Sequence, residues 1–562
     1  MRQAILFLVL ALVCCCGSHA VVNLEVNKTT GSPGGPVIFD NLTAAVDAAL
    51  VAVDDPDGAG GPSPNADTAI ITITDSETYT DPWAFSQAAR STFLGDFTEF
   101  LEGMPITLTS NAATPQTRPV VRTVPHPMWG PLGFADDTGH GPYLGANGAT
   151  VSNIIYEWNR DATGGGGGPG VGIPLPIGSS TNLTFNDVIF RVTDTMVTGV
   201  TAGDHWTTAF GGLSLLFGFQ ENPVTLNFNN CVMDDSENPD TGEWIQYFAD
   251  ATDSPAYTFN HNGCLFNDFG DNLYLGQNSN MVFLNFADCV IRDCSEGGPC
   301  SLDNTTTVVD RCIFERCGTG PPPGSQSGAV SLADRGTVDF DRIMTVRNSL
   351  FVDCGDPNNN DPDAGLAACG FGTNESDPLT AQSIGTVIHC TFDRCSSALL
   401  IDNEGPGTFR FVNNIVRDTT AGAVYVRGHT TNAVDLTVSN NVLENANTAA
   451  VGTGAAVDTG AALVNLIESN NPTAAPGFLA GQDTVDTTSV ATAFAGGPYD
   501  LDPTSGGDAI GLADPFVNAS EGGSQDLDGG PRMNIGGDQP DSGAQEVTSS
   551  PPSNVERWKL FE

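Results

Sequence analysis

Lysine is almost absent from this chain. Its two lysines are Lys28 and Lys559, and the other basic residues are arginines. Basic residues number 20 against 67 acidic ones, which gives a net charge of −47. So acidic a surface repels nucleic acid and anionic membranes. The lack of lysine between positions 28 and 559 also disfavours enzymes whose catalytic base is a lysine.

Long apolar runs are missing as well. The apolar run from Ile5 to Cys16 is too short to cross a bilayer comfortably. Arg2 precedes this run and Ser18-His19-Ala20 follows it, which is the order of an export signal. The sequence therefore predicts a signal peptide over residues 1–20, no transmembrane segment, and a mature protein that is secreted, extracellular or at the cell surface.

The eleven cysteines that follow residue 20 all lie between Cys231 and Cys395. Disulfides are expected in an exported chain, and an odd number leaves at least one thiol unpaired. Pairing within a segment (Cys312 with Cys317) and pairing between segments (Cys294 with Cys317) both remain open. The disulfide candidates are Cys289, Cys294, Cys312, Cys317, Cys390 and Cys395.

Short segments of one pattern recur through the middle of the chain. They begin at Cys231, Cys264, Cys289, Cys312, Asn348, Cys390, Asn414 and Asn441, and the uninterrupted ones follow one another at about 25 residues. A period of this length is typical of a solenoid. Residues alternate in and out along a short strand, so we expect Cys312 and Phe314 to face inward and Ile313 and Glu315 outward. Asn or Asp at the segment ends tolerates the bent backbone of a turn.

The N-terminal end of the repeat region is predicted to consist of a capping helix followed by the first strands. Residues 41–51 read as a short amphipathic helix with Asn41 as its N-cap, and this helix is expected to cap the first coil. Strands are predicted over residues 68–74, 77–79, 105–110 and 118–121. An open solenoid end exposes unpaired strand edges, which is why a cap is needed.

Several motifs resemble those of secreted right-handed β-helix proteins. Ser327-Gly-Ala-Val and Ala421-Gly-Ala-Val are similar to repeats of polymorphic outer-membrane proteins. Asp526-Leu-Asp-Gly-Gly-Pro-Arg and Asp541-Ser-Gly-Ala-Gln-Glu resemble the closing module of choice-of-anchor Q proteins. The resemblance implies an all-β fold, a right-handed parallel β-helix of the pectate-lyase-like kind with an N-terminal helix cap.

The predicted organisation divides the chain into five parts. They are a signal peptide (1–20), an N-terminal cap with the first coils (21–145), a central β-helix with Cys and Asn ladders (146–460), the last coils with the closing module (461–548), and a polar tail (549–562). Asn-x-Ser/Thr sequons give glycosylation candidates at Asn27, Asn41, Asn182, Asn304, Asn374 and Asn518.

Two sets of charged residues offer candidate chemistry. An arginine base with Ca²⁺ describes one kind of acidic-glycan lyase, in which calcium lowers the pKa of the proton beside the uronate carboxylate. Arg292 and Arg316 are the candidate catalytic residues. The candidate calcium ligands are Asp234, Asp235, Asp268 and Asp271. The competing interpretation, which we favour, pairs the arginines with neighbouring acids in a surface ladder.

Two functions follow from these observations. The favoured one is a noncatalytic extracellular protein with an adhesive, matrix or glycan-binding role, whose partner is a polysaccharide or a cell-surface glycan and not nucleic acid. The alternative is a polysaccharide-active enzyme, a Ca²⁺-assisted lyase or a hydrolase, that acts on acidic glycans. No cofactor other than Ca²⁺ is indicated.

Overall fold

The computed structural model describes the chain in segments that form two compact units, Met1–Asn260 and His261–Glu562. The predicted signal peptide (1–20) and polar tail (549–562) lie outside the described residues. Those residues are 21–30, 38–42, 44–45, 48–49, 69–79, 106–122, 147–159, 181–193, 215–217, 223–234, 245–249, 257–269, 273–278, 282–294, 298, 300–301, 305–318, 328–332, 341–355, 367–373, 383–403, 407–419, 422–428, 434–439, 441–444, 456–457, 464–466, 484–485 and 525–527.

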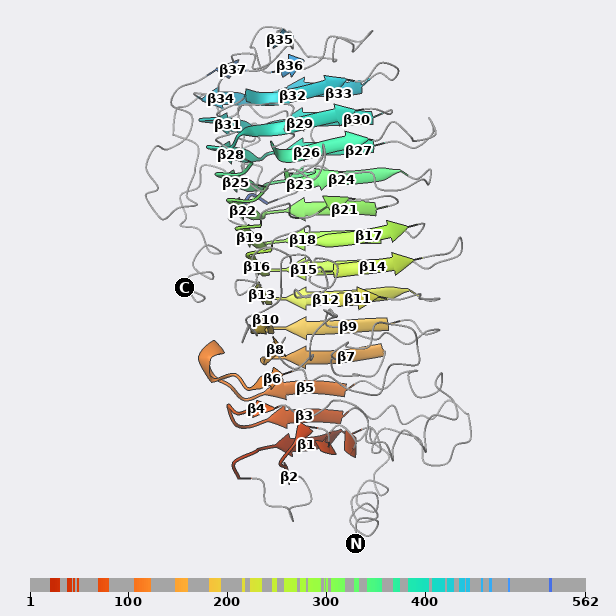
Figure 1. The fold of residues 1–562 in the computed structure, drawn as a ribbon, viewed down its shortest axis with the longest axis vertical. Coiled ribbons are helices and arrows are strands. Elements are labelled where there is room, and N and C mark those ends of the chain that lie inside the picture. Colours follow the sequence, from red (N-terminus) through yellow and green to blue (C-terminus); the bar gives the residue numbers. More distant parts are fainter. Residues whose placement is uncertain are drawn as a thin grey trace, which may run out of the picture. The chain divides into compact units, whose positions relative to one another are not determined.

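The Met1–Asn260 unit holds parallel strands in successive coils (Figure 1). Its long-strand sheet has the order β2 (Ile38–Phe39), β1 (Val22–Val26), β3 (Ala69–Ile73), β5 (Ile106–Ser110), β7 (Asn147–Ser152), β9 (Thr181–Asn186) and β12 (Val224–Asn229). Its short-strand sheet has the order β4 (Thr78–Tyr79), β6 (Val120–Arg122), β8 (Ile155–Asn159), β10 (Ile189–Thr193) and β13 (Val232–Asp234). A third sheet contains β11 (Leu215–Phe217) and β14 (Ile245–Ala249), and η2 (Pro115–Thr117) is a short 3-10 helix.

The His261–Glu562 unit repeats the plan. The long-strand sheet contains β18 (Val282–Ala287), β21 (Thr305–Asp310), β24 (Arg342–Arg347), β27 (Ser383–Ile388), β30 (Gly407–Val412) and β33 (Val434–Ser439). The short-strand sheet contains β16 (Leu265–Asn267), β19 (Val290–Arg292), β22 (Ile313–Glu315), β25 (Leu350–Val352), β28 (Thr391–Asp393), β31 (Ile415–Arg417), β34 (Val442–Glu444) and β37 (Thr484–Val485). The third sheet contains β20 (Cys300–Ser301), β23 (Gly328–Leu332), β26 (Ala367–Thr373), β29 (Ser397–Asn403), β32 (Gly422–Gly428), β36 (Val464–Leu466) and β35 (Ala456–Val457). Strand β15 (Tyr257–Asn262) contains the unit boundary, and β17 (Tyr274–Asn278) follows it.

In both units each strand pairs with the equivalent strand of the next coil, parallel and in register. Thus Val290, Ile313 and Leu350 stand opposite one another on β19, β22 and β25. Strands β35 and β36 form an antiparallel pair. Each unit is therefore a parallel β-helix, and the strands predicted at residues 68–74, 77–79, 105–110 and 118–121 are confirmed as β3, β4, β5 and β6.

The core forms where alternate side chains of the coils meet. Strands of the long-strand sheet, such as β18 and β24, show strict alternation between buried and half-buried residues. Because the register is exact, like side chains stack from coil to coil. The rings of Phe314, Phe351 and Phe392 stack face to face, with centroids 4.6 and 4.8 Å apart.

The predicted orientation of one side chain is wrong. Ile313 was expected to face water, yet only 4% of it is exposed. Its register partners Val290 and Leu350 are also buried, so Ile313 lies between apolar side chains of the neighbouring coils. Apolar side chains above and below remove it from water, although the strand is only three residues long.

The turns on either side of the short strands use a left-handed backbone. Positive φ occurs at Asn, Asp, Arg and His residues, which sequence patterns predict for Asn and Asp but not for Arg or His. The amides of most of these residues donate to the next coil, as in Arg316 N to Val352 O at 3.0 Å and Arg394 N to Arg417 O at 3.0 Å. These hydrogen bonds hold the strained residues in place.

The predicted N-terminal helix is present in part. Leu42, Ala44, Ala45, Ala48 and Ala49 have helical backbone, and Leu42, Ala45 and Ala49 are buried. The amide of Ala44 donates to Asn41 Oδ1 at 2.8 Å, which is the bond of an N-cap. That this helix seals the first coil stays a prediction.

The aromatic stack should dominate local stability. Phe351→Ala should lower the free energy of unfolding by about 3–5 kcal/mol, because it opens a cavity between Phe314 and Phe392. The matched control Phe283→Ala, on the half-buried outer side of β18, should cost about 1 kcal/mol or less. Urea unfolding followed by circular dichroism measures both, and equal losses would contradict this packing.

Candidate functional site

Charged side chains gather in the turns that follow the short strands of the His261–Glu562 unit. We call this set the charged turn column. Its left-handed members are Asp268, Asp293, Arg316, Asp353, Arg394 and Asp418, and they occupy equivalent positions in successive coils. Acidic and basic residues follow one another along the column, so each arginine has an acid in the coil before it.

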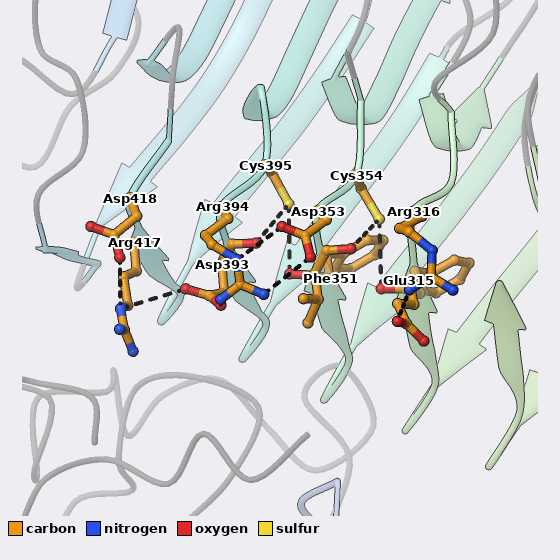
Figure 2. A network of polar contacts seen from close by, with 12 residues as sticks. Glu315, Arg316, Phe351, Asp353, Cys354, Asp393, Arg394, Cys395, Arg417 and Asp418 are labelled. Atoms are coloured by element: carbon orange, nitrogen blue, oxygen red, sulfur yellow. Dashed lines mark hydrogen bonds and ion pairs between the residues drawn. The ribbon is translucent and has the colours of Figure 1, made fainter. Parts of the chain in front are cut away.

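Each arginine of the column forms a two-pronged ion pair with the preceding coil. Arg316 Nε and Nη2 lie 2.6 and 2.7 Å from the carboxylate oxygens of Asp293. Arg394 contacts Asp353 in the same way at 2.9 and 3.1 Å, as Figure 2 shows. Arg316 also contacts Glu315 and Arg394 also contacts Asp393. The favoured surface-ladder arrangement is thus present at these arginines.

Asp393 is the most enclosed acid of this network. Its side chain is 0% exposed, and it lies between Arg394 and Arg417, whose Nε is 3.5 Å away. Burial raises the pKa of the Asp393 carboxyl, while the two arginines oppose that rise. The buried carboxylate therefore depends on its cationic neighbours.

The two catalytic candidates are both engaged by neighbouring side chains. Arg292 Nε donates to Asn267 Oδ1 at 2.7 Å, and Arg316 holds Asp293. They belong to different positions of the coil, since Arg292 ends β19 and Arg316 follows β22. A catalytic role for either one stays a prediction.

The calcium candidates are only partly described. Asp235 and Asp271 lie outside the described residues. Asp234 ends β13 in one unit, and Asp268 belongs to the charged turn column of the other, with its amide donating to Arg292 O at 3.1 Å. Among the residues that the structure describes, no group of three or more His, Cys, Asp or Glu is placed to hold a metal ion.

A second charged cluster, which the sequence interpretation missed, follows the long strands of the same unit. Arg311 forms a two-pronged pair with Asp288 at 2.9 and 2.9 Å and also contacts Asp310 at 2.8 Å. Asp310 in turn accepts from Arg347 at 3.3 Å and from Asn348 at 2.9 Å. The charged residues lie at the ends of three long strands: Asp288 and Arg311 follow β18 and β21, and Asp310 and Arg347 end β21 and β24.

Cysteine, serine and asparagine share one buried column between the long and short strands. Its members in the His261–Glu562 unit are Cys264, Cys289, Cys312, Ser349, Cys390, Asn414 and Asn441. The Cys289 thiol donates to His261 O at 3.6 Å, and Asn441 Nδ2 donates to Phe411 O at 2.9 Å. Both carbonyls belong to the long strand of the preceding coil, so a thiol and an amide satisfy equivalent backbone acceptors.

A second buried column contains thiols alone at successive rungs. Backbone hydrogen bonds from Gly318 to Cys294, from Gly355 to Cys317 and from Ser396 to Cys354 put Cys294, Cys317, Cys354 and Cys395 in order. The thiols of Cys317, Cys354 and Cys395 each donate to a carbonyl of the coil before, as Cys354 does to Phe314 O at 3.6 Å. Burial raises the pKa of Cys294 and Cys354 well above the ordinary thiol value.

The expected disulfides are not formed in this structure. The ten cysteines whose side chains are described, including the six disulfide candidates, are buried free thiols. Cys312 and Cys317 lie at opposite ends of β22 and belong to different columns, so the two thiols of this segment do not face each other. Neighbouring rungs of a parallel stack lie about 4.8 Å apart, which is within the usual Cα–Cα range of disulfides, so pairing between coils stays a prediction.

His261 is another buried titratable group. Its ring stacks on Phe286 with centroids 4.8 Å apart and tilts against Phe266. Burial lowers its pKa to about 3, although a hydrogen bond with the Asn285 backbone opposes this effect. At neutral pH His261 is therefore an uncharged core aromatic residue.

The glycosylation candidates differ in their surroundings. Asn27 is buried, donates to Thr74 Oγ1 at 2.9 Å and accepts from the amides of Thr29 and Thr30. Asn41 caps the helix, whereas Asn182 is exposed on β9. Asn304, Asn374 and Asn518 lie outside the described residues. Of the described sequons, Asn182 is the one whose side chain extends into solvent.

Comparison with known proteins supports the fold. Residues 252–443 match a family model described as a right-handed β-helix region. A search of the curated proteins gave no match. Together with the long parallel sheets, the match confirms the predicted all-β, right-handed parallel β-helix. Within the described segments, no helix has the length and hydrophobicity needed to cross a membrane.

Removing Arg394 should make stability pH-dependent. Without this cation the pKa of buried Asp393 rises further, so the folded state holds a proton that the unfolded chain releases. Arg394→Ala should therefore lose stability as pH rises above the ordinary value of 3.8, reaching a loss of about 1–3 kcal/mol at pH 7.

Arg292→Ala is the control for this prediction, because the partner of Arg292 is the neutral Asn267. Its loss should be the same at pH 4 and pH 7. Urea unfolding of both variants and of the wild type at each pH measures the difference. A pH-independent loss for Arg394→Ala would contradict the role given to Asp393.

The thiol columns should resist thiol reagents until the chain unfolds. We expect the ten cysteines whose side chains are described to be silent in the native protein because they are buried. Burial also raises the pKa of Cys289, Cys312 and Cys369, whereas at Cys317 the effect of burial is outweighed by hydrogen bonds from neighbouring thiols, which lower its pKa to about 5. In denaturant without reductant at least ten cysteines should titrate as thiols with a chromogenic disulfide reagent. A lower count, with cross-linked peptides in a non-reducing digest, would restore the disulfide prediction.

Proposed function

We propose that this chain is a secreted or cell-surface β-helix protein with a noncatalytic, adhesive or glycan-binding role. The observation that carries the proposal is the mutual engagement of its candidate catalytic charges. Arg316 binds Asp293 and Glu315, and Arg292 binds Asn267. Arginines used in this way hold consecutive coils together, and a lyase base would instead have to face a substrate proton.

Sequence features support an extracellular place for the protein. Residues 1–20 have the order of an export signal, and the motifs around Asp526 and Asp541 resemble a choice-of-anchor Q closing module. In the structure Asp526 and Leu527 are buried, as a module packed on the fold requires. The Gly-Ala-Val motifs at Ser327 and Ala421 further liken the coils to polymorphic outer-membrane proteins.

The charge of the chain restricts its partners. A net charge of −47 repels nucleic acid, anionic lipid and acidic glycans unless cations intervene. A glycan partner requires no counter-charge, because hydrogen bonds and ring contacts suffice for its recognition. A neutral or cation-bridged cell-surface glycan is therefore the partner class that the composition favours.

Glycan assays separate binding from catalysis. The purified chain should bind at least one member of a panel of neutral and acidic polysaccharides, as measured by affinity electrophoresis. It should generate no unsaturated product, measured by ultraviolet absorbance, from pectate, alginate or glycosaminoglycans, with or without Ca²⁺. Turnover abolished by Arg292→Ala or Arg316→Ala would overturn the noncatalytic proposal and establish the lyase alternative.

A further inference from the structure

From β3 to β12, the described outward side chains of the long-strand sheet in the Met1–Asn260 unit carry no charge, and Glu25 of β1, opposite Thr72, lies at the edge of this surface. Inward residues such as Leu108, Leu183 and Phe228 are buried, so the residues between them face outward. We call these outward residues the neutral face. Its members from β3 to β12 are Thr72, Thr107, Thr109, Thr150, Ser152, Asn182, Thr184, Asn186, Thr225, Asn227 and Asn229.

These residues stand in register from coil to coil. One column runs through Thr107, Thr150, Thr184 and Asn227. A second column contains Ser152, Asn186 and Asn229, and Thr72 stands opposite Thr109. Rungs are about 4.8 Å apart, and outward residues of one strand are about 6.6 Å apart. The neutral face is thus a regular grid of hydroxyl and amide groups.

Hydrogen bonds between coils orient the amides. Asn227 Nδ2 donates to Asn182 Oδ1 at 3.0 Å, and Asn229 Nδ2 donates to Asn186 Oδ1 at 2.9 Å. Asn260 continues the series by donating to Asn227 Oδ1 at 2.9 Å. Each side-chain amide has two donor hydrogens and two acceptor lone pairs. An amide that is oriented by one bond to its neighbour can therefore still form hydrogen bonds to a ligand.

The corresponding outward positions in the His261–Glu562 unit are mixed. They include the charged residues Asp310, which is buried, Arg347 and Arg410, beside neutral residues such as Thr306 and Thr345. In a chain with 87 charged residues among 562, a run of small neutral residues over β3 to β12 requires an explanation. Charged side chains here would disfavour an uncharged ligand rich in hydroxyl groups, because its binding would cost the free energy of removing water from the charges.

We propose that the neutral face binds an extended neutral polysaccharide, whose successive sugar hydroxyls pair with successive rungs. This inference rests on the proposed glycan-binding function and adds the site and the ligand class. A sugar polymer presents hydroxyl groups at intervals comparable with the rung spacing, so several weak contacts add along its length. A protein partner would instead require aromatic or arginine anchors, which the neutral face lacks.

Removal of hydroxyl groups tests the site. The triple variant T107V/T150V/T184V keeps side-chain shape and strand preference while it removes three consecutive hydroxyls of one column. The matched control T306V/T345V/T386V makes the same change on outward positions of β21, β24 and β27. Equal far-ultraviolet spectra and unfolding midpoints establish that both variants fold.

The probes are cellulose, mannan and β-1,3-glucan, with alginate and pectate as acidic comparators. We expect the wild type and the control variant to bind a neutral probe and the neutral-face variant to bind at least about tenfold more weakly. Equal binding by both variants would overturn the site and leave the proposed function standing. Binding to acidic probes alone would overturn the ligand class, and binding to none would overturn both proposals.

A second copy of the chain is the competing occupant of this face. Sedimentation velocity of the wild type and the neutral-face variant tests it. A monomeric wild type supports the glycan assignment. Self-association of the wild type that is lost in T107V/T150V/T184V would overturn it.

Discussion

Backbone hydrogen bonds between successive coils govern every other feature of the two units. Each coil exchanges backbone hydrogen bonds with the coils on both sides: Val290 N donates to Cys264 O of the coil before it, and Arg316 N donates to Val352 O of the coil after it. Parallel pairing at a fixed spacing puts equivalent side chains directly above one another. Whatever a position contains must therefore tolerate a similar group at about 4.8 Å on either side. Phenylalanine satisfies this condition by stacking rings, and from Asp293 to Asp418 the charged turn column satisfies it by alternating acids and arginines.

The buried polar columns show the same constraint in the core. A side chain between the long and short strands must satisfy the carbonyl of the preceding long strand, since a buried carbonyl without a donor is costly. Asn414 and Asn441 do so with amides, and Cys289 does so with a thiol. Cysteine in these columns is thus a small donor that packs well, in a fold whose stability comes from neighbour-to-neighbour contacts. The abundance of cysteine here does not by itself indicate disulfides.

The repeat itself was predictable because it is local. A five-residue segment such as Cys312 to Arg316 contains the inner residue, the strand and the turn, so its recurrence defines coils, strands β16 to β34 and the charged turn column. The burial of Ile313 was not predictable from alternation, because it depends on apolar partners in other coils. The neutral face was missed for a related reason. Thr107-Leu-Thr109 and Asn182-Leu-Thr184 each look like ordinary half-buried strands, and they form columns only once the register across long intervening segments is known.

Charge in this chain is segregated by position in the coil. Turn positions concentrate the arginines that neutralise neighbouring acids, as Arg311 does between Asp288 and Asp310 and Arg394 does between Asp353 and Asp393. Arginine suits these turns better than lysine, because its planar fork bridges two carboxylates in successive coils with fixed geometry. The scarcity of lysine is then consistent with a fold that needs bridging cations at turns. Ion pairs also form on strands, as between Arg191 of β10 and Glu157 of β8. From β3 to β12 of the long-strand sheet, however, the polar outward residues are hydroxyls and amides, whose bonding to a neutral polymer does not weaken with salt as an ion pair would.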